Sequence, residues 1–311
     1  MSCTGALPWP SRPLQISGCS RNLITSMRLV YQTARGQLYE GDCLDFLKTI
    51  PAESVHTFFA DPPFNLQKKY GKNGSDSRPE REYLEWSYEW LREAVRVLAP
   101  GGSIFIYNLP KWLIPYGAFL NSIPELTFKH WIAIDKAHSL PIPNRLSPSH
   151  YGMLFFIKGK KPRVFDRDAV RIPIAICRHC QKDIKDYGGH KKFLNPKGIN
   201  LSDVWDDIPP VRHRKYKYRT PNELAPQIIE RVILLTTKPE DIVCDPFVGG
   251  GTTAYVAERL GRRWLCADLN TVSAATRRLS DLENGVHPAW KSSSKTRPAS
   301  EEVVSTLPLF R

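Results

Sequence analysis

The sequence predicts an α/β fold with a mostly parallel sheet, and three observations support this fold class. Short apolar segments alternate along the chain with longer segments whose apolar residues recur at helical spacing. The glycines at positions 249–251 stand between one such strand and one such helix. The turn Asp61-Pro62-Pro63-Phe64 also follows an apolar segment of strand type. Turns that end strands in this way commonly carry binding residues.

Each predicted element has its own local signal. Strands are expected at short runs rich in branched and aromatic residues: 37–39, 55–59, 103–107, 130–134, 152–157, 242–244 and 264–267. Helices are expected where apolar residues recur every three or four positions: 82–98, 112–122, 222–236, 253–260 and 272–284. The 311 residues, 41% of them hydrophobic, can bury a substantial core.

The glycine turn, residues 247–253, predicts a binding site for a nucleoside-containing cofactor. Glycines let the backbone approach a ligand closely, and free N–H groups at a helix N-terminus favour a negatively charged group. Thr252 and Thr253 can cap that helix or donate hydrogen bonds. Asp268 follows about 20 residues later, where nucleotide-binding folds place a carboxylate for ribose. A glycine-rich turn of any α/β protein is the alternative.

The Asp61-Pro62-Pro63-Phe64 turn predicts a site that holds an amino group. Two prolines fix the backbone and remove two N–H donors, so nearby carbonyls stay free to accept hydrogen bonds. Asp61 adds a carboxylate, and Phe64 adds a flat apolar face for stacking. An Asp-Pro surface turn is the alternative.

Together the two motifs resemble a known family. Asp-Pro-Pro-Phe followed later by Phe-x-Gly-x-Gly-Thr is similar to the amino-group DNA methyltransferases that use S-adenosylmethionine. The motif order resembles their β arrangement, in which the catalytic half precedes the cofactor half. The resemblance covers residues 36–285 and implies a Rossmann-like methyltransferase sheet with a basic target-recognition insert.

The resemblance implies a role for each matching residue. Asp61 and the Pro62 carbonyl would accept hydrogen bonds from the target amino group, with Pro63 completing the turn and Phe64 stacking on the base. His150 and Tyr151 would help form the target-base pocket. The cofactor would contact Asp42, Asp245, Phe247, Gly249, Gly251, Thr252, Thr253 and Asp268.

The first residue of the catalytic motif bears on the target base. Asp-Pro-Pro is usual for family members that modify adenine, and Ser-Pro-Pro or Thr-Pro-Pro for those that modify cytosine. Asp61 therefore favours the N6 amino group of adenine, reached by turning the base out of double-stranded DNA. Cytosine N4 is the alternative. Phe64 stands where tyrosine is commoner and keeps the stacking face.

The charge balance favours an anionic partner. Lysine plus arginine exceeds aspartate plus glutamate by 44 minus 31, which is 13. The excess gathers between residues 158 and 219, interleaved with aromatic residues, as suits contacts with phosphates and bases. The expected DNA contacts are Arg212, Arg214, Lys215, Lys217 and Arg219. A solvated charged face is the alternative.

The predicted organisation has five parts. Residues 1–27 are an expected disordered extension, 28–157 the catalytic half, 158–219 the target-recognition region, 220–285 the cofactor half and 286–311 a disordered tail. The final residues look like a peptide that docks on the bacterial sliding clamp, although a floppy apolar terminus is favoured. The oligomeric state is left open, with a homodimer as one alternative. The layout is typical of restriction-modification systems.

No metal is expected. Cys177 and Cys180 form a C-x-x-C pair and His190 could assist, but a closed zinc site needs four ligands and no second pair occurs. Structural thiols are favoured over zinc. The seven cysteines, an odd number mostly in apolar contexts, suit a reducing interior, so a cytoplasmic, nucleoid-associated protein is expected. No apolar run approaches the roughly 18 residues of a membrane helix.

Three other functions compete with this interpretation. A nicotinamide-dependent oxidoreductase would leave Asp-Pro-Pro-Phe without a role, and the third glycine of its fingerprint is missing because the run continues Thr-Thr-Ala. A non-catalytic DNA-binding protein explains only the basic region. RNA as substrate is an alternative that charge does not distinguish.

Overall fold

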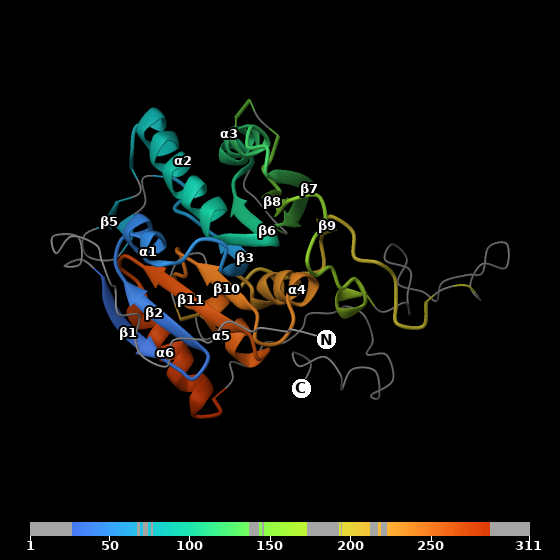
Figure 1. Ribbon diagram of the computed structural model, residues 1–311. Helices are drawn as coiled ribbons and strands as arrows, with labels where there is room; N and C mark the ends of the chain where they lie inside the picture. The colour runs from blue at the N-terminus through green and yellow to red at the C-terminus, as the bar shows by residue number, and fades with distance from the viewer. Residues whose placement is uncertain are drawn as a thin grey trace, which may run out of the picture.

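The computed structural model describes residues 27–66, 69–70, 74–75, 77–136, 143–144, 146–172, 193, 195–211, 217–218 and 223–286. Its main feature is a nine-stranded sheet with the order β1-β2-β11-β10-β3-β6-β8-β7-β9 (Figure 1). These strands are β1 (Arg28–Gln32), β2 (Gly36–Glu40), β3 (Val55–Ala60), β6 (Leu98–Asn108), β7 (Leu126–Asp135), β8 (His150–Lys158), β9 (Val204–Trp205), β10 (Ile242–Asp245) and β11 (Arg263–Asp268). A separate two-stranded sheet consists of β4 (Lys69–Tyr70) and β5 (Gly74–Ser75).

The centre of the large sheet is parallel. Strands β2, β11, β10, β3 and β6 pair in parallel with their neighbours, while β1 and the β6-β8-β7 side pair antiparallel. The short strand β9 adds in parallel to β7. The predicted α/β fold with a mostly parallel sheet is therefore confirmed.

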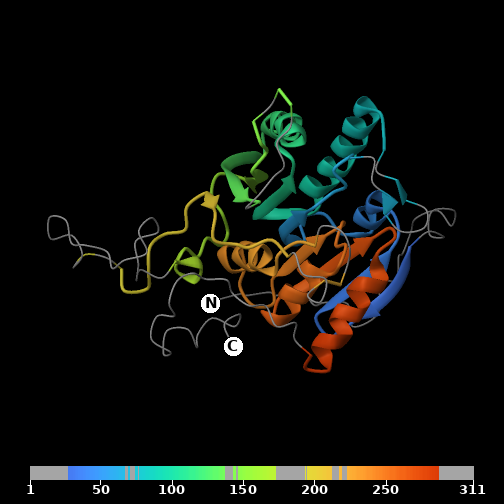
Figure 2. The ribbon, with the colours of Figure 1, turned by 180° about the vertical axis from the view of Figure 1, so that it is seen from behind.

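Helices cover both faces of the sheet. The helices are α1 (Cys43–Thr49), α2 (Glu80–Val97), α3 (Pro110–Asn121), α4 (Pro226–Thr236), α5 (Thr252–Arg259) and α6 (Val272–Glu283), with a 3-10 turn η2 (Asp168–Val170). Helices α1 to α3 lie on one face and α4 to α6 on the other, as both views show (Figures 1 and 2). Each face has its own apolar core, with Phe46, Trp90 and Tyr116 in one and Ile229 and Tyr255 in the other. None of the described helices is long and apolar enough to span a membrane.

All the predicted strands and helices are present, with shifted ends. Two strands of the large sheet and one helix that packs on it were not predicted. These are β1, α1 and β9, which are all short. Helix α1 has seven residues and begins where the Asp42 carboxylate accepts a hydrogen bond from Leu44 N at 2.8 Å. Helix α4 begins at Pro226, later than predicted, because proline suits the first helical turn.

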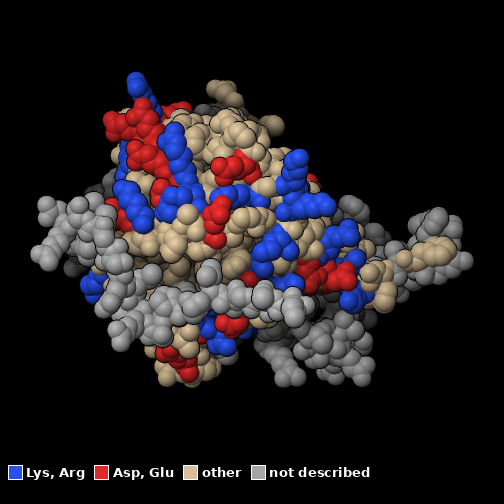
Figure 3. All heavy atoms as spheres, viewed as in Figure 1, with Lys and Arg blue, Asp and Glu red and all other residues tan. Residues whose placement is uncertain are grey.

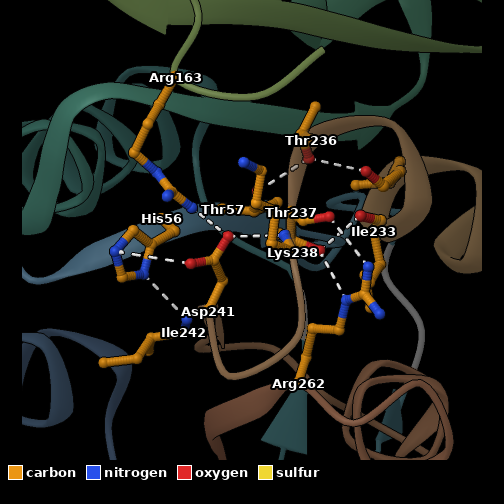
Figure 4. Close-up of polar contacts among 11 residues, drawn as sticks. His56, Thr57, Arg163, Ile233, Thr236, Thr237, Lys238, Asp241, Ile242 and Arg262 are labelled. Atoms are coloured by element: carbon orange, nitrogen blue, oxygen red, sulfur yellow. Dashed lines mark hydrogen bonds and ion pairs between the residues drawn. The ribbon is translucent and has the colours of Figure 1, made fainter. Parts of the chain in front are cut away.

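A buried polar cluster ties the sheet together at the edge where β3 and β10 begin (Figure 4). The Asp241 carboxylate accepts hydrogen bonds from Lys238 N, at 2.7 Å, and from Arg163. It also lies 3.9 Å from Nε2 of His56, whose Nδ1 accepts a hydrogen bond from Ile242 N at 2.9 Å. Burial lowers the pKa of His56, against the opposing charge of Asp241. The cluster joins segments that lie far apart in the chain.

Replacing Asp241 with alanine should lower the free energy of unfolding by about 2–3 kcal/mol, because partly buried donors lose their acceptor. Urea unfolding followed by circular dichroism measures this. The exposed Asp203, 3.7 Å from His130, provides the control, and its alanine variant should change stability by less than about 0.5 kcal/mol. Equal losses in the two variants would contradict a special role for Asp241.

Candidate active site

A cavity of about 510 Å³ opens at the carboxyl ends of the central parallel strands. The segments that follow β2, β3, β10 and β11 all contribute to its wall, because the ends of neighbouring parallel strands meet at one edge of the sheet. The predicted residues among its lining are Asp42, Asp61, Pro62, Pro63, Phe64, Tyr151, Lys217, Phe247 and Asp268. The Asp61–Phe64 turn and Phe247, the first residue of the glycine turn, therefore share one cavity. The predicted cofactor residues that border a separate small hollow instead are Asp245, Gly249, Thr252 and Thr253.

The Asp61–Phe64 turn is held by hydrogen bonds from two aromatic side chains. Trp112 Nε1 donates a hydrogen bond to the Phe64 carbonyl at 2.8 Å, and the Tyr83 hydroxyl donates to the Pro63 carbonyl. Asp61 lies at the cavity wall. Burial, reinforced by the Asp61 charge, raises the pKa of Tyr107 and Tyr151. Both tyrosine hydroxyls therefore stay protonated beside the Asp61 carboxylate.

Three rings form an aromatic cluster next to Asp61: Phe64, Tyr107 and Tyr151. Ring centres are 5.7 Å apart for Phe64 and Tyr151, and 5.1 Å apart for Tyr107 and Tyr151. Stacked bases lie about 3.4 Å apart, so a base sandwiched between two rings needs their centres roughly 7 Å apart. A base can therefore stack on this cluster from the cavity, but the rings must separate before it can enter between them.

His150 stands apart from this cluster. It is exposed, pairs with Asp135 at the start of β8, and is not among the residues that line the cavity. Its predicted role at the target base stays a prediction, whereas Tyr151, the next residue, reaches the cavity wall.

The glycine turn between β10 and α5 is fixed by two carboxylates. Asp268 Oδ2 accepts a hydrogen bond from Gly249 N at 3.0 Å. The Asp245 carboxylate accepts from Phe247 N at 2.9 Å and from the Thr253 hydroxyl at 2.6 Å. The Thr253 hydroxyl, which was predicted to contact a cofactor, thus donates its hydrogen bond to Asp245 instead. These bonds set the loop's shape before any ligand arrives.

Left-handed backbone angles explain two of the glycines in this turn. Gly249 has φ of 53° and Gly251 has φ of 79°, which side chains disfavour. A Cβ at Gly251 would also meet the Ala275 Cα at 2.7 Å. Glycine at 251 therefore lets α6 pack directly against the start of α5.

Asp245 is a buried carboxylate beside the glycine turn. Burial raises its pKa from the ordinary 3.8 to about 7, with further upward effects from the negative charges of Asp61 and Asp268, against lowering by its hydrogen bonds. Below about pH 7 the folded protein therefore favours the protonated carboxyl group.

Because folding raises the pKa of Asp245, this group stabilises the fold below pH 4, and the contribution is lost as pH rises through 7. We expect Asp245→Asn to remove that dependence. The difference in unfolding free energy between wild type and variant should change by about 4 kcal/mol between pH 4 and pH 8. Urea unfolding at several pH values measures it. Parallel pH profiles would contradict the expectation, and Asp203→Asn should give such a parallel profile.

Several predicted residues lie outside the described part of the chain. These are Arg212, Arg214, Lys215 and Arg219 of the basic region, the C-x-x-C residues Cys177 and Cys180, and His190. Residues 1–26 and the tail from 287 onward also lie outside it. Among the described residues, no group of three His, Cys, Asp or Glu side chains could hold a metal. Cys43, Cys244 and Cys266 are buried free thiols whose pKa is raised by burial.

The cavity also contains residues that the sequence did not indicate. Arg78 lies with its guanidinium 4.7 Å from the Trp86 ring centre, and Lys136 Nζ lies 4.9 Å from the Tyr151 ring centre. Both cations line the cavity, as does Lys217. Figure 3 shows Lys and Arg side chains at several places on this face of the molecule, with Asp and Glu side chains between them. These cations suit a polyanionic partner.

Comparison with known proteins decides the family. A DNA methylase family model for N6 and N4 methyltransferases matches residues 55–275. The chain belongs to this DNA methylase family. The resemblance drawn from its two motifs is thereby confirmed.

The chain has clear relatives in this family. It is 46% identical over 262 residues to the type II methyltransferase M.BamHI of Bacillus amyloliquefaciens, a match covering 84% of this chain and 61% of that protein. The chain thus spans less than two thirds of that relative's length. It is 31% identical over 240 residues to the DNA adenine methyltransferase YhdJ of Escherichia coli K12, covering 75% of this chain and 78% of that protein.

Solved structures share the fold of this chain. The PvuII DNA methyltransferase, named as cytosine-N4-specific, superposes with a TM-score of 0.59 at 20% identity, covering 83% of this chain and 94% of that chain. The M1.HpyAVI–SAM complex gives a TM-score of 0.53 at 18% identity, covering 78% and 98%. The predicted Rossmann-like methyltransferase sheet is thus confirmed.

Proposed function

We propose that this DNA methylase transfers a methyl group from S-adenosylmethionine to an exocyclic amino group of a base in double-stranded DNA. The observation that carries the proposal is the single cavity lined by both Asp61-Pro62-Pro63-Phe64 and the Phe247 and Asp268 turns. M.BamHI and M.HpaI of Haemophilus parainfluenzae are named type II methyltransferases. A place in a restriction-modification system follows from that likeness.

The cavity residues suit the cofactor's groups. S-adenosylmethionine, when bound, supplies a methyl group activated by a sulfonium. Asp268 already accepts three backbone hydrogen bonds, from Gly249, Asn270 and Thr271. A carboxylate offers about four acceptor positions, so Asp268 can take roughly one ribose hydroxyl more. Asp42, at the neighbouring strand end, adds a second carboxylate to the same wall.

The catalytic motif acts by position and charge. Asp61 and the Pro62 carbonyl accept hydrogen bonds from the target amino group, which orients the nitrogen and concentrates electron density on it. Asp61 then stabilises the positive charge that develops on nitrogen. The apolar rings of Phe64 and Tyr151 hold the base and exclude water. No covalent enzyme intermediate is required.

We propose N6 of adenine as the target, because Asp61 begins the catalytic motif and because the relative YhdJ is named a DNA adenine methyltransferase. N4 of cytosine is the second candidate, since both amino groups present the same chemistry to Asp61. The name of the PvuII enzyme shows that this fold also serves cytosine.

The proposal assigns DNA recognition to residues 158–219. Lys217, on the cavity wall, would contact phosphate near the displaced base. Residues 28–157 and 220–285 remain the proposed catalytic and cofactor halves. The homodimer and the sliding-clamp contact of the tail stay predictions.

The test incubates the full chain with mixed-sequence duplex DNA and methyl-labelled S-adenosylmethionine, followed by nucleoside mass spectrometry. Label in N6-methyladenine supports the whole proposal, and label in N4-methylcytosine keeps the reaction but overturns the base. Cofactor binding without label on DNA overturns the proposal, and a parallel incubation with RNA then separates an RNA substrate from a binding protein.

A further inference from the structure

Arg278 of α6 is a fully buried arginine directly behind the cofactor turn. Its side chain has 0% exposure. The guanidinium donates hydrogen bonds to the Thr252 hydroxyl and to the Glu223 carboxylate. Thr252 opens α5, and Glu223 precedes α4. The Arg278 side chain therefore links the glycine turn, through Thr252, to the segment before α4, through Glu223.

On one side, this arginine anchors the last described residues of the basic region. Glu223 Oε2 accepts a hydrogen bond from Tyr218 N at 2.6 Å, and the Tyr218 ring centre lies 4.6 Å from the Arg278 guanidinium carbon. The Tyr218 hydroxyl donates to Asp281 at 2.8 Å, and Arg277 donates to the Tyr218 carbonyl at 2.9 Å. Lys217, which directly precedes Tyr218 in the chain, lines the cavity.

On the other side, the same arginine supports the cavity wall. Glu223 and Leu224 line the cavity together with Asp268. The Thr252 hydroxyl lies 3.5 Å from the Leu224 carbonyl, to which it donates. Glu223 and Thr252 also border, with Gly249, a small hollow beside Asp245. Displacing Arg278 would therefore disturb the DNA side and the cofactor side together.

The energetics point to a role other than stability. A buried ion pair repays its desolvation only when every donor and acceptor is satisfied. Among the described atoms, Arg278 Nε has no hydrogen-bond partner. A pair that is incompletely satisfied contributes little net stability, whereas it fixes the relative position of the elements that it joins.

We propose that Arg278 is a positioning residue that couples DNA binding by the Lys217–Tyr218 segment to the affinity of the cofactor pocket. This inference rests on the proposed function. DNA that contacts this segment acts on Glu223 through the hydrogen bond from Tyr218, and Glu223 is joined through Arg278 to Thr252 at the glycine turn. By linkage, DNA should raise cofactor affinity and cofactor should raise DNA affinity by the same factor.

The test measures binding of S-adenosylhomocysteine, the demethylated form of the cofactor, by calorimetry with the full chain. Each titration is made without DNA and with a duplex containing the sequence that the wild-type protein methylates. The readout is the dissociation constant without DNA divided by the dissociation constant with DNA, and we expect this ratio to be about 10 for wild type. We expect the ratio to fall to about 1 in Arg278→Lys, which keeps the charge but not the planar guanidinium.

A second variant tests the coupling at Tyr218, in the segment proposed to bind DNA. Tyr218→Leu keeps the backbone bond to Glu223 but removes the ring beside Arg278 and the hydroxyl that donates to Asp281, and it should lower the ratio toward 1. Arg92→Met, at an exposed arginine of α2 that lies 5.1 Å from the Phe119 ring centre, is the matched control and should keep the ratio. If Arg278→Lys fails to fold, Tyr218→Leu alone decides.

Each outcome has a defined meaning. A wild-type ratio of 1, or an unchanged ratio in Arg278→Lys or in Tyr218→Leu, overturns the coupling while the methylation assay still supports the proposed function. A wild-type protein that neither binds S-adenosylhomocysteine nor methylates DNA overturns the proposed function itself.

Discussion

Replacing Asp61 with alanine should lower kcat by about 10² to 10³-fold, while the affinity for S-adenosylmethionine changes little. The size follows from the usual effect of removing one preorganised hydrogen-bonding group from a transition state. Asp61 lies on the cavity wall beside Tyr107 and Tyr151, two phenols that stay uncharged, so neither of these two side chains can replace its charge.

Steady-state methylation with labelled cofactor measures this effect, and calorimetry with S-adenosylhomocysteine shows whether the pocket is intact. Asp61→Asn, which keeps one acceptor oxygen, should retain more activity than Asp61→Ala. Asp203→Ala serves as the control at an exposed aspartate. A kcat within tenfold of wild type for Asp61→Ala would remove Asp61 from the mechanism.

Gly251→Ala should weaken cofactor binding by about a hundredfold or more, which is 2.7 kcal/mol or above. The new Cβ would lie 2.7 Å from the Ala275 Cα and 2.8 Å from its Cβ, so α6 must move away from α5. The φ of +79° adds backbone strain of about 1 kcal/mol or more. Because the Asp245 and Asp268 carboxylates hold the same turn, its displacement shifts both of them.

Gly261 offers a matched control for this substitution. It has φ of +68°, but a Cβ there meets nothing within 4 Å. Gly261→Ala therefore introduces similar strain without the clash, and it should lower stability by about 1 kcal/mol without changing cofactor affinity. Calorimetry and urea unfolding of both variants make the comparison. Equal cofactor affinities in the two variants would show that contact between the turn and α6 is unimportant.

The parts of the site that could be predicted are those with a local signal. Asp61 and Phe247 follow apolar strands, and the topology of a parallel sheet brings such strand ends to one edge. The sequence pattern therefore indicated both the fold and the two motifs that share the cavity.

The rest depends on contacts between distant segments. Arg278 resembles any helical arginine until α6 packs behind the glycine turn, and Lys136 gains its place only through the pairing of β7 with β8. The direct contact of Phe64 with Tyr151 and the engagement of Thr253 by Asp245 are also tertiary facts. Periodicity and motif spacing carry no information about such contacts.

The strand order of the sheet has a consequence for the connectivity of the chain. Strand β2, from the first half of the chain, pairs with β11 from the last part, and β10 pairs with β3. The Tyr31 hydroxyl of β1 donates a hydrogen bond to Glu283 at the end of α6, so the first strand and the last helix among the described residues touch. Joining them and opening the chain between β8 and α4 would give a circular permutant in which the glycine motif comes first. The order of the two motifs along the chain thus depends on where the termini lie. Their proximity in space depends on the strand order of the sheet.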